Sequence, residues 1–195
     1  MLFQKVCKLA AIITVSLLTF TGIAVAEDFD NDKNSILKGS YLVSGNQYCV
    51  VANADGFDEN LILISGGSTN SMAIEGEYIF NGDGTGSSFQ NWQTIYNNSL
   101  NPGQRPLNYG TVEADFTYTV NMDGTFEMTA DEATVTGHYG LQATIDGYGT
   151  MTGVIASGQK TFTYTDVNPN IETIHTASGD RERICHRTKI GIKIE

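Results

Sequence analysis

The stretch VEADFTYTVNMDG, residues 112–124, carries the pattern that decides the fold. Apolar and polar residues alternate along it, with Ala114, Phe116, Tyr118 and Val120 on one side and Glu113, Asp115, Thr117 and Thr119 on the other. Because successive side chains of a strand point to opposite faces, this alternation predicts a half-buried strand. Residues 121–124 then predict a hairpin turn, since glycine adopts positive φ angles freely and Asn and Asp tolerate them.

The same alternation recurs along most of the chain. Ile74, Tyr78 and Phe80 alternate with Glu75 and Glu77, and an Asn-Gly-Asp-Gly turn follows at residues 81–84. No stretch predicts a long helix, and the best short candidate is a single turn within residues 56–63. About ten short strands with tight reversals predict an all-β fold. We expect an antiparallel, up-and-down β-barrel of about 8–10 strands, with a β-sandwich as the alternative.

The N-terminal region predicts export. Residues 1–26 have the form of a secretory signal peptide, with Lys5 and Lys8 before an apolar stretch and Ala-Val-Ala at the cleavage site. Residues 27–36 are polar and acidic and predict a flexible lead-in, so residues 37–195 are expected to form one barrel domain. We therefore expect a periplasmic or extracellular protein, with no membrane-spanning helix after the signal.

Two cysteines remain after cleavage, because Cys7 leaves with the signal. Cys49 and Cys185 are predicted to form a disulfide, which an oxidising compartment maintains. Bonded cysteines have Cα atoms within about 7 Å of each other. An early strand and the last strand are therefore expected to lie close together, as they do in a closed barrel and also in some sandwiches.

The charge of the chain excludes nucleic acid as a partner. The formal net charge is −11, and it becomes −13 when the two lysines of the signal are lost (−11 minus two). Binding to phosphates needs clusters of Lys and Arg. Arginines gather only at Arg181, Arg183 and Arg187, where a solvated strand face is expected and an anion site is the alternative.

No constellation of residues identifies a reaction, a cofactor or a metal. The three histidines have no spacing typical of a zinc site, and residues 28–39 lack the Gly and Glu that a calcium loop needs. No Gly-x-Ser-x-Gly elbow occurs. The carboxylate pairs Glu75 with Glu77 and Glu113 with Asp115 are expected on the wet outer surface. We thus expect no catalytic residues.

Three residues are candidate ligand contacts: His186, Trp92 and Tyr118. His186 shares a face with Ile184, Ile190, Ile192 and Ile194, and we expect that face to point inward. There His186 is either a hydrogen-bonded core residue or a ligand contact. Trp92, with Phe89 and Tyr96, is expected in the core, lining a cavity, or on a carbohydrate platform. Residues 97–108 contain two prolines and predict a loop, which is a candidate lid.

Three motifs resemble a group of small, uncharacterised exported bacterial all-β proteins. They are LKGSY at residues 37–41, the turn at residues 81–84 and RICHR at residues 183–187. This resemblance implies export and an all-β fold, and it implies no activity. The chain also resembles lipocalins, which open with a Gly-x-Trp motif whose Trp packs on a late Arg. Here Tyr41 stands in place of the Trp, with Arg181, Arg183 or Arg187 as the partner.

These observations favour a non-enzymatic exported β-barrel that binds a small apolar ligand, or an envelope protein without a tight ligand. One alternative is a small hydrolase-like enzyme on the same scaffold, with His186 and an inward carboxylate as its acid and base. The other is an eight-stranded outer-membrane barrel, against which stands the strongly polar alternate face of the strands. The sequence leaves the oligomeric state open.

Overall fold

The computed structural model describes residues 33–96, 107–166, 168 and 170–194 of the chain. Most of these residues lie in ten strands: β1 (Lys38–Ala52), β2 (Gly67–Asn81), β3 (Thr85–Tyr96), β4 (Leu107–Val120), β5 (Thr125–Gly137), β6 (Gln142–Asp146), β7 (Met151–Ile155), β8 (Thr161–Asp166), β9 (Ile171–Thr176) and β10 (Gly179–Lys193). The helices of this part of the chain are two short 3-10 helices, η1 (Lys33–Ile36) and η2 (His138–Gly140), and neither is long or apolar enough to cross a membrane.

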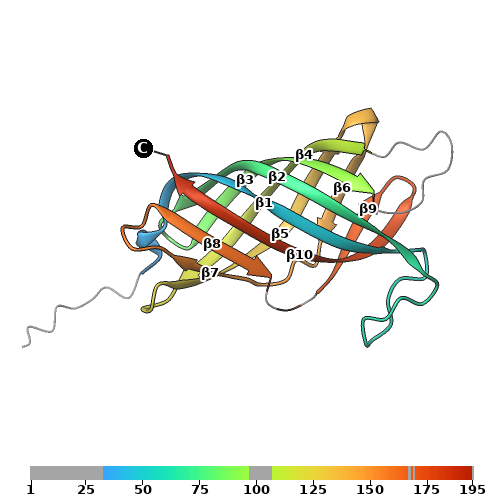
Figure 1. The fold of residues 1–195 in the computed structure, drawn as a ribbon, viewed down its shortest axis with the longest axis horizontal. Coiled ribbons are helices and arrows are strands. Elements are labelled where there is room, and N and C mark those ends of the chain that lie inside the picture. The colour runs from blue at the N-terminus through green and yellow to red at the C-terminus, as the bar shows by residue number, and fades with distance from the viewer. Residues whose placement is uncertain (1–32, 97–106, 167, 169, 195) are drawn as a thin grey trace, which may run out of the picture.

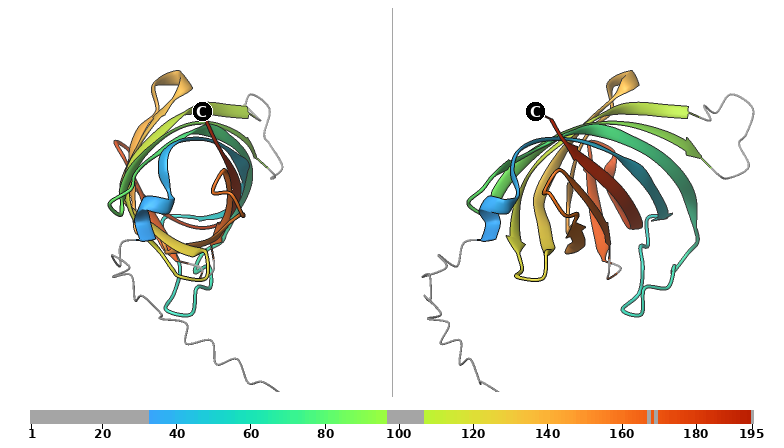
Figure 2. Two further views of the ribbon diagram at one scale, coloured as in Figure 1. Left: turned by 90° about the vertical axis from the view of Figure 1, so that its left-hand side faces the viewer. Right: turned by 60° about the vertical axis from the view of Figure 1, so that its left-hand side comes forward.

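The strands form one antiparallel sheet that closes on itself (Figure 1). Each strand from β1 to β5 pairs with the next, and β1 also pairs with β10, which joins the two ends of the sheet. Two short strands share the edge of β5: β7 pairs with its first half and β6 with its second half. Two others share the edge of β10 in the same manner, with β9 along its first half and β8 along its second half, so each pair of short strands occupies one position of the ring. The ring therefore has eight positions, and the predicted up-and-down barrel is confirmed; Figure 2 shows the ring from one end.

The hairpin turns have the chemistry that the sequence predicts. In the turn after β4, Asp123 accepts hydrogen bonds from the backbone N–H and the hydroxyl of Thr125, at 3.0 and 2.7 Å. Gly124 follows with a φ angle of 83°, where a side chain would be strained. Asp83 makes the same two contacts with Thr85 after β2. The two Asp-Gly-Thr sequences are thus turn motifs.

Aromatic side chains fill one end of the barrel. Tyr41, Phe80 and Phe162 are among the most deeply buried residues there, with ring centroids 5.3 to 5.6 Å apart. The ring of Phe162 lies over Gly191 of β10, where an added Cβ would come within 2.3 Å of it. The basic residue over Tyr41 is Lys193, whose Nζ lies 5.8 Å from the ring centroid. The resemblance to lipocalins implied a late arginine at this place.

The helix η1 packs at the same end, where Figure 2 shows it at one side of the rim of the ring. Asn34 accepts a hydrogen bond from the backbone N–H of Val120 at 2.9 Å, and Ile36 packs against the aromatic core. Leu37, directly after the helix, is fully buried. Residues 33–36, which were expected to belong to a flexible lead-in, therefore form a short helix, and Asn34 and Ile36 contact the barrel. Residues 27–32 lie outside the described part of the chain.

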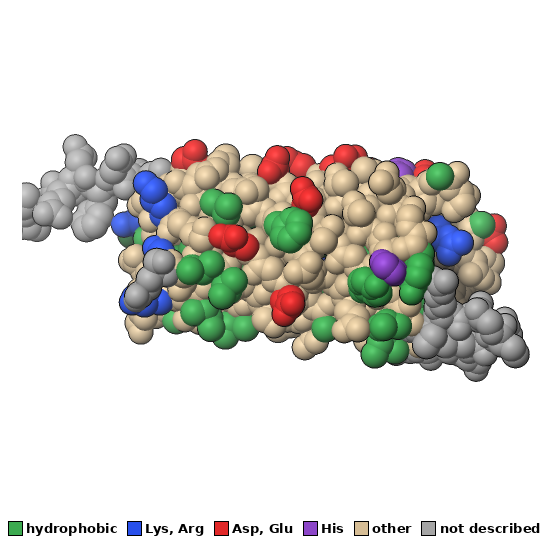
Figure 3. Space-filling model, turned by 90° about the horizontal axis from the view of Figure 1, so that it is seen from above, with side chains coloured by type: hydrophobic (Ala, Val, Ile, Leu, Met, Phe, Trp, Pro, Cys, Tyr) green, Lys and Arg blue, Asp and Glu red, His purple; other side chains and the backbone are tan. Residues whose placement is uncertain are grey.

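The outer face of the barrel is polar over much of its area. Glu75, Glu113 and Asp115 are exposed there, as expected for the carboxylate pairs. Figure 3 shows acidic side chains distributed among hydrophobic ones on one side of the barrel. The connection between β1 and β2 has turns and one bridge between Phe57 and Leu63, and no helical turn forms within residues 56–63. Of the candidate lid, residues 97–106 lie outside the described residues.

Candidate functional site

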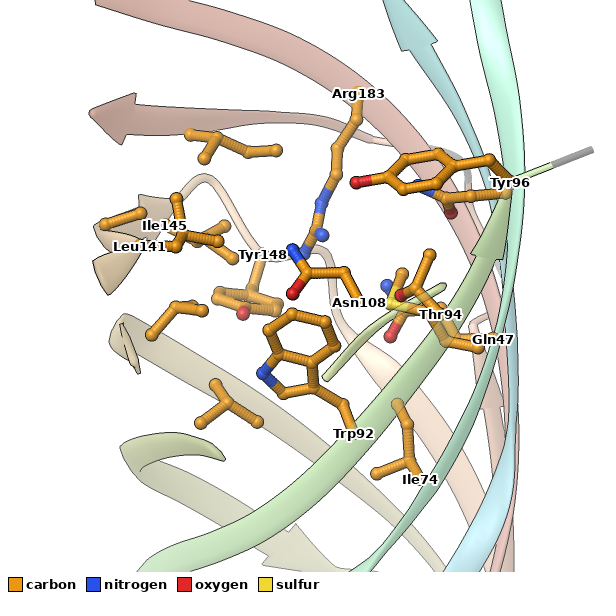
Figure 4. A pocket seen from close by; sticks show the side chains of 16 residues that line it. Gln47, Ile74, Trp92, Thr94, Tyr96, Asn108, Leu141, Ile145, Tyr148 and Arg183 are labelled. Atoms are coloured by element: carbon orange, nitrogen blue, oxygen red, sulfur yellow. The ribbon is translucent and has the colours of Figure 1, made fainter. Parts of the chain in front are cut away.

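The barrel half away from η1 contains a cavity of about 160 Å³ that is partly open to solvent. Its walls come from strands around the ring, because each strand that enters this half contributes alternate residues to the interior. Much of the lining is apolar: Met72, Ile74, Trp92, Val135, Ala143 and Ile145. Polar side chains complete it, and Figure 4 shows Arg183 reaching into the same space. This cavity is the candidate binding site.

Trp92 is the predicted residue that the structure places in the cavity. Its side chain is mostly buried, and its Nε1 donates a hydrogen bond to the backbone oxygen of Thr111 at 3.2 Å. Because this bond satisfies the indole nitrogen, the ring presents an apolar face to the cavity. Tyr96, four residues further along β3, also lines the cavity, whereas Phe89 is exposed on the outer face.

Tyr118 lies at the other end of the barrel, away from the cavity. Its hydroxyl donates to the backbone oxygen of Leu37 at 2.7 Å and accepts from the backbone N–H of Gly82 at 2.9 Å. It also lies 3.1 Å from the backbone oxygen of Asn34. These contacts join η1 and the turn after β2 to the wall, so the geometry of Tyr118 is that of a structural residue.

His186 faces outward, and the expectation that it lies inside the barrel is wrong. It stands opposite Tyr48 in the β1–β10 ladder and is exposed. Its neighbour Cys185 is buried, and adjacent residues of a strand point to opposite faces. The same parity places Ile190 and Ile192 on the outer face. The structure thus separates His186 from the interior carboxylates, which removes the geometric basis of the acid–base pair considered above.

The inward face of β10 is basic. Arg183, Arg187 and Lys189 are all buried, so the expectation of a solvated arginine face is wrong for Arg183 and Arg187. Arg181, nearer the strand's beginning, is exposed. The sequence contains a signal for this arrangement, since Cys185 shares the parity of all three buried residues and cysteine is among the residue types most often fully buried.

Two carboxylates pair with the arginines, one buried (Glu172) and one partly buried (Asp166). The Oε2 atom of Glu172 lies 2.7 Å from Nε of Arg183, and its Oε1 atom accepts a hydrogen bond from Arg187. Asp166 pairs with Arg187 at 3.0 Å. Burial opposes the charge of Arg187, but the two carboxylates outweigh burial and raise its pKa. Burial also raises the pKa of Asp166. Both oxygens of Glu172 are therefore occupied by guanidinium groups.

Lys189 lies further along β10 than the arginines and contacts Tyr78 and Tyr164 of the aromatic half. Its Nζ donates to the hydroxyl of Tyr78 at 3.1 Å and to the side-chain oxygen of Gln90. Burial, followed by the nearby charge of Arg187, lowers the pKa of Lys189 to about 7. A cavity of about 50 Å³ adjoins this amine and shares Gln47 and Tyr148 with the larger cavity.

Gln47 connects the charged side chains to the disulfide. Its Nε2 lies 3.0 Å from Sγ of Cys49 and 3.1 Å from Sγ of Cys185. Its Oε1 accepts a hydrogen bond from Nε of Arg187 at 3.1 Å. The predicted disulfide is present between β1 and β10, and Gln47, which contacts both sulfurs, lines the cavity.

Tyr148 enters the interior through an interruption of the barrel wall. It lies in residues 147–150, between β6 and β7, where the ladder to the next position of the ring is broken. Its ring lies 5.1 Å from the guanidinium carbon of Arg187, and its hydroxyl bonds to Arg183. Burial raises the pKa of Tyr148. No strand pattern marks this residue, so the sequence alone does not indicate that it reaches the interior.

Two buried side-chain atoms of the described residues lack a hydrogen-bond partner, and one of them borders the cavity. These atoms are Oδ1 of Asn70 and Oδ1 of Asp166. Asn70 stands opposite Cys49 in the β1–β2 ladder and lines the cavity. An unpartnered buried acceptor costs about 1–3 kcal/mol. A polar group of a ligand, or water, would remove this cost.

Within the described ranges, no group of three His, Cys, Asp or Glu side chains is placed to bind a metal. The one histidine with close carboxylates is His175, which lies 3.1 Å from Asp146 and 3.0 Å from Asp180 at the surface. Hydrogen bonds to Asp146 and then Asp180 raise its pKa. Comparison of the sequence with protein-family models and with curated proteins gives no match.

Proposed function

We propose that this protein is an exported carrier that takes a small, largely apolar ligand into the cavity around Trp92. The observation that carries the proposal is the contrast between the two halves of the barrel. Aromatic rings fill one half, whereas the other leaves a partly open cavity of about 160 Å³ whose lining is largely apolar. A cavity of about 150 Å³ is large enough to bind benzene. Because apolar surface gains about 25 cal/mol per Å² when it leaves water, such walls favour an apolar occupant.

Export is proposed from the predicted signal and the disulfide together. Residues 1–26 have the charge and apolar pattern of a signal peptide, and disulfides persist in oxidising compartments. The polar outer face favours an aqueous setting over the outer-membrane alternative. Exposed carboxylates such as Glu75, Glu113 and Glu127 would lie in the lipid-facing band of a membrane barrel, where charged residues are destabilising.

The test uses the fluorescence of Trp92, the only tryptophan of the chain. The mature protein is titrated with octan-1-ol, a neutral apolar probe. We expect a saturable change in Trp92 emission and a matching heat of binding. Val135→Phe, which fills part of the cavity, should weaken binding at least tenfold. Thr134→Phe is the matched control, because Thr134 is the outward neighbour on the same strand.

Two results would contradict the proposal. One is the absence of any saturable response to octan-1-ol. The other is an equal loss of binding in Val135→Phe and Thr134→Phe, which would place the probe on the outer surface. Native mass spectrometry of protein purified from an exporting host provides an independent measurement, since a retained small molecule would appear as added mass.

A further inference from the structure

We propose that the ligand of this cavity is a small apolar acid whose carboxylate binds to Arg183. The inference rests on the proposed function and specifies the chemistry of the ligand. Arg183 lines the cavity, and the exposed fraction of its side chain is 10%. A guanidinium held in such a place binds a carboxylate through two parallel N–H···O bonds, a geometry that a hydroxyl or an amine does not reproduce.

The hydrogen bonds of Arg183 leave part of its guanidinium for a ligand. Glu172 occupies the Nε side at 2.7 Å, and Tyr148 contributes a hydroxyl to the same group. Figure 4 shows the rest of the guanidinium pointing into the cavity, away from the strand that carries it. A hydroxyl is a weaker partner for a guanidinium than a carboxylate, because hydrogen bonds between two charged groups are roughly twice as strong.

The charges inside the barrel favour an anion. Three basic side chains, Arg183, Arg187 and Lys189, share the interior with two acidic ones, Glu172 and Asp166. Below about pH 7, where Lys189 is charged, a single negative charge on the ligand would balance the set. Above that pH the two arginines balance the two carboxylates, and the preference for an anion rests on the guanidinium of Arg183. The lowered pKa of Lys189 agrees with an excess of positive charge, since Arg187 contributes to the shift after burial. A cationic ligand has no free acceptor on Glu172, whose two oxygens already pair with the arginines.

Asn70 gives a second, independent indication of a polar group in this ligand. Its Oδ1 is buried, lacks a partner and belongs to a side chain that lines the cavity. Asn70 and Arg183 flank the disulfide, since Asn70 pairs with Cys49 and Arg183 lies two residues from Cys185. Because Oδ1 and a carboxylate both accept hydrogen bonds, Asn70 contacts the carboxylate only with its amide rotated so that the NH₂ group faces the cavity. The polar end of the ligand therefore belongs beside the disulfide, and its apolar body belongs against Trp92.

The test compares three probes that share an octyl chain: octanoate, octan-1-ol and octylammonium. Binding to the mature protein is followed by Trp92 fluorescence and by calorimetry at pH 7.5. A hydrogen bond to a charged group contributes about 1.5–3 kcal/mol, so octanoate should bind about 10 to 100 times more tightly than octan-1-ol. Octylammonium should bind more weakly than octan-1-ol.

Arg183→Gln is the test variant, and Arg181→Gln is its matched control, because Arg181 is exposed on the same strand and the charge change is identical. Arg183→Gln should remove the preference for octanoate and leave the affinity for octan-1-ol within about twofold. Arg181→Gln should keep the preference. If Arg183→Gln fails to fold, the order of the three probes in the unaltered protein decides the matter.

The inference fails if octan-1-ol binds but octanoate binds no better, or if Arg183→Gln keeps the preference. Either result would leave the carrier proposal standing, because a neutral apolar ligand would still occupy the cavity. If none of the three probes binds, the proposed function fails first and the inference fails with it.

Discussion

Cys49 of β1 stands directly opposite Cys185 of β10, and the disulfide between them joins the first strand of the barrel to the last. Their Cα atoms are 4.1 Å apart, although 136 residues separate them in sequence. This ladder is the seam that turns an open sheet into a ring. In the unfolded chain the bond therefore keeps the segments of β1 and β10 close together, and these are the two strands that must pair to close the barrel.

Replacement of both cysteines by serine should destabilise the protein without opening the barrel. In the chain-entropy model, a loop of this length contributes about 4–5 kcal/mol to the free energy of unfolding. We expect a loss of that order in urea denaturation, with an unchanged far-ultraviolet circular dichroism spectrum at low denaturant. Two alkylated thiols per mature chain under denaturing, non-reducing conditions would show instead that the exported protein lacks the bond.

The pattern of alternation predicted the buried face of β4 correctly and that of β10 wrongly. In β4 the apolar face is the inner face, so Phe116 and Tyr118 are buried as expected. In β10 the isoleucines lie outside, and Arg183 and Arg187 lie inside. Hydrophobicity alone selects the wrong face of such a strand, because the buried charges are compensated by Glu172 and Asp166. Those partners lie on β9 and β8, and strand pairing cannot be read from local pattern.

The cavity itself was foreseen only through Trp92. This single tryptophan was expected in the core, lining a cavity, or on a carbohydrate platform, whereas Tyr148 and Asn70 carry no comparable signal. Tyr148 reaches the interior from an interruption between two short strands. The sequence nevertheless indicated which face of β10 is buried, because cysteine is among the residue types most often fully buried and Cys185 lies on this strand. Once Cys185 points inward toward Cys49, residues 183, 187 and 189 must point inward as well.

The packing of η1 against the barrel should depend on the hydroxyl of Tyr118. Tyr118→Phe removes its bonds to the backbone of Leu37 and Gly82 and keeps the buried ring. Each lost hydrogen bond of this kind costs about 1 kcal/mol, so we expect a decrease of about 1–2 kcal/mol in the free energy of unfolding. Octan-1-ol binding should not change, because the cavity lies in the other half. Weaker binding with unchanged stability would make Tyr118 a ligand contact after all.

Truncation of neighbouring residues of β10 should lower the free energy of unfolding by very different amounts. Arg187→Ala leaves Glu172 and Asp166 without one of their buried partners, and breaking a buried ion pair in this way costs about 3–5 kcal/mol. His186→Ala and Thr188→Ala, on the exposed face of the same strand, should each change stability by less than about 0.5 kcal/mol. Chemical denaturation of the three variants measures the contrast. Comparable losses at Arg187 and His186 would mean that the strand is turned the other way.

Lys189 should make the stability of the barrel depend on pH in the alkaline range. Its pKa is about 7 in the folded protein, against the ordinary value of 10.5 expected for the unfolded chain. Between these values the unfolded chain binds a proton that the folded protein lacks, so raising the pH favours folding. Below about pH 7 both states carry the proton, and the cost of burying the charged amine is fully present.

Lys189→Met removes this titration while it keeps a long apolar stem in the same space. The variant should exceed the unaltered protein in stability most clearly at pH 6 to 7, and the difference should shrink as the pH rises toward 10. The slope of that difference is at most about 1.4 kcal/mol per pH unit. Urea denaturation of both proteins at each pH provides the measurement, with Lys38→Met as the control, since Lys38 is exposed. Parallel stability curves for Lys189→Met and the unaltered protein would mean that the amine keeps its proton throughout this range.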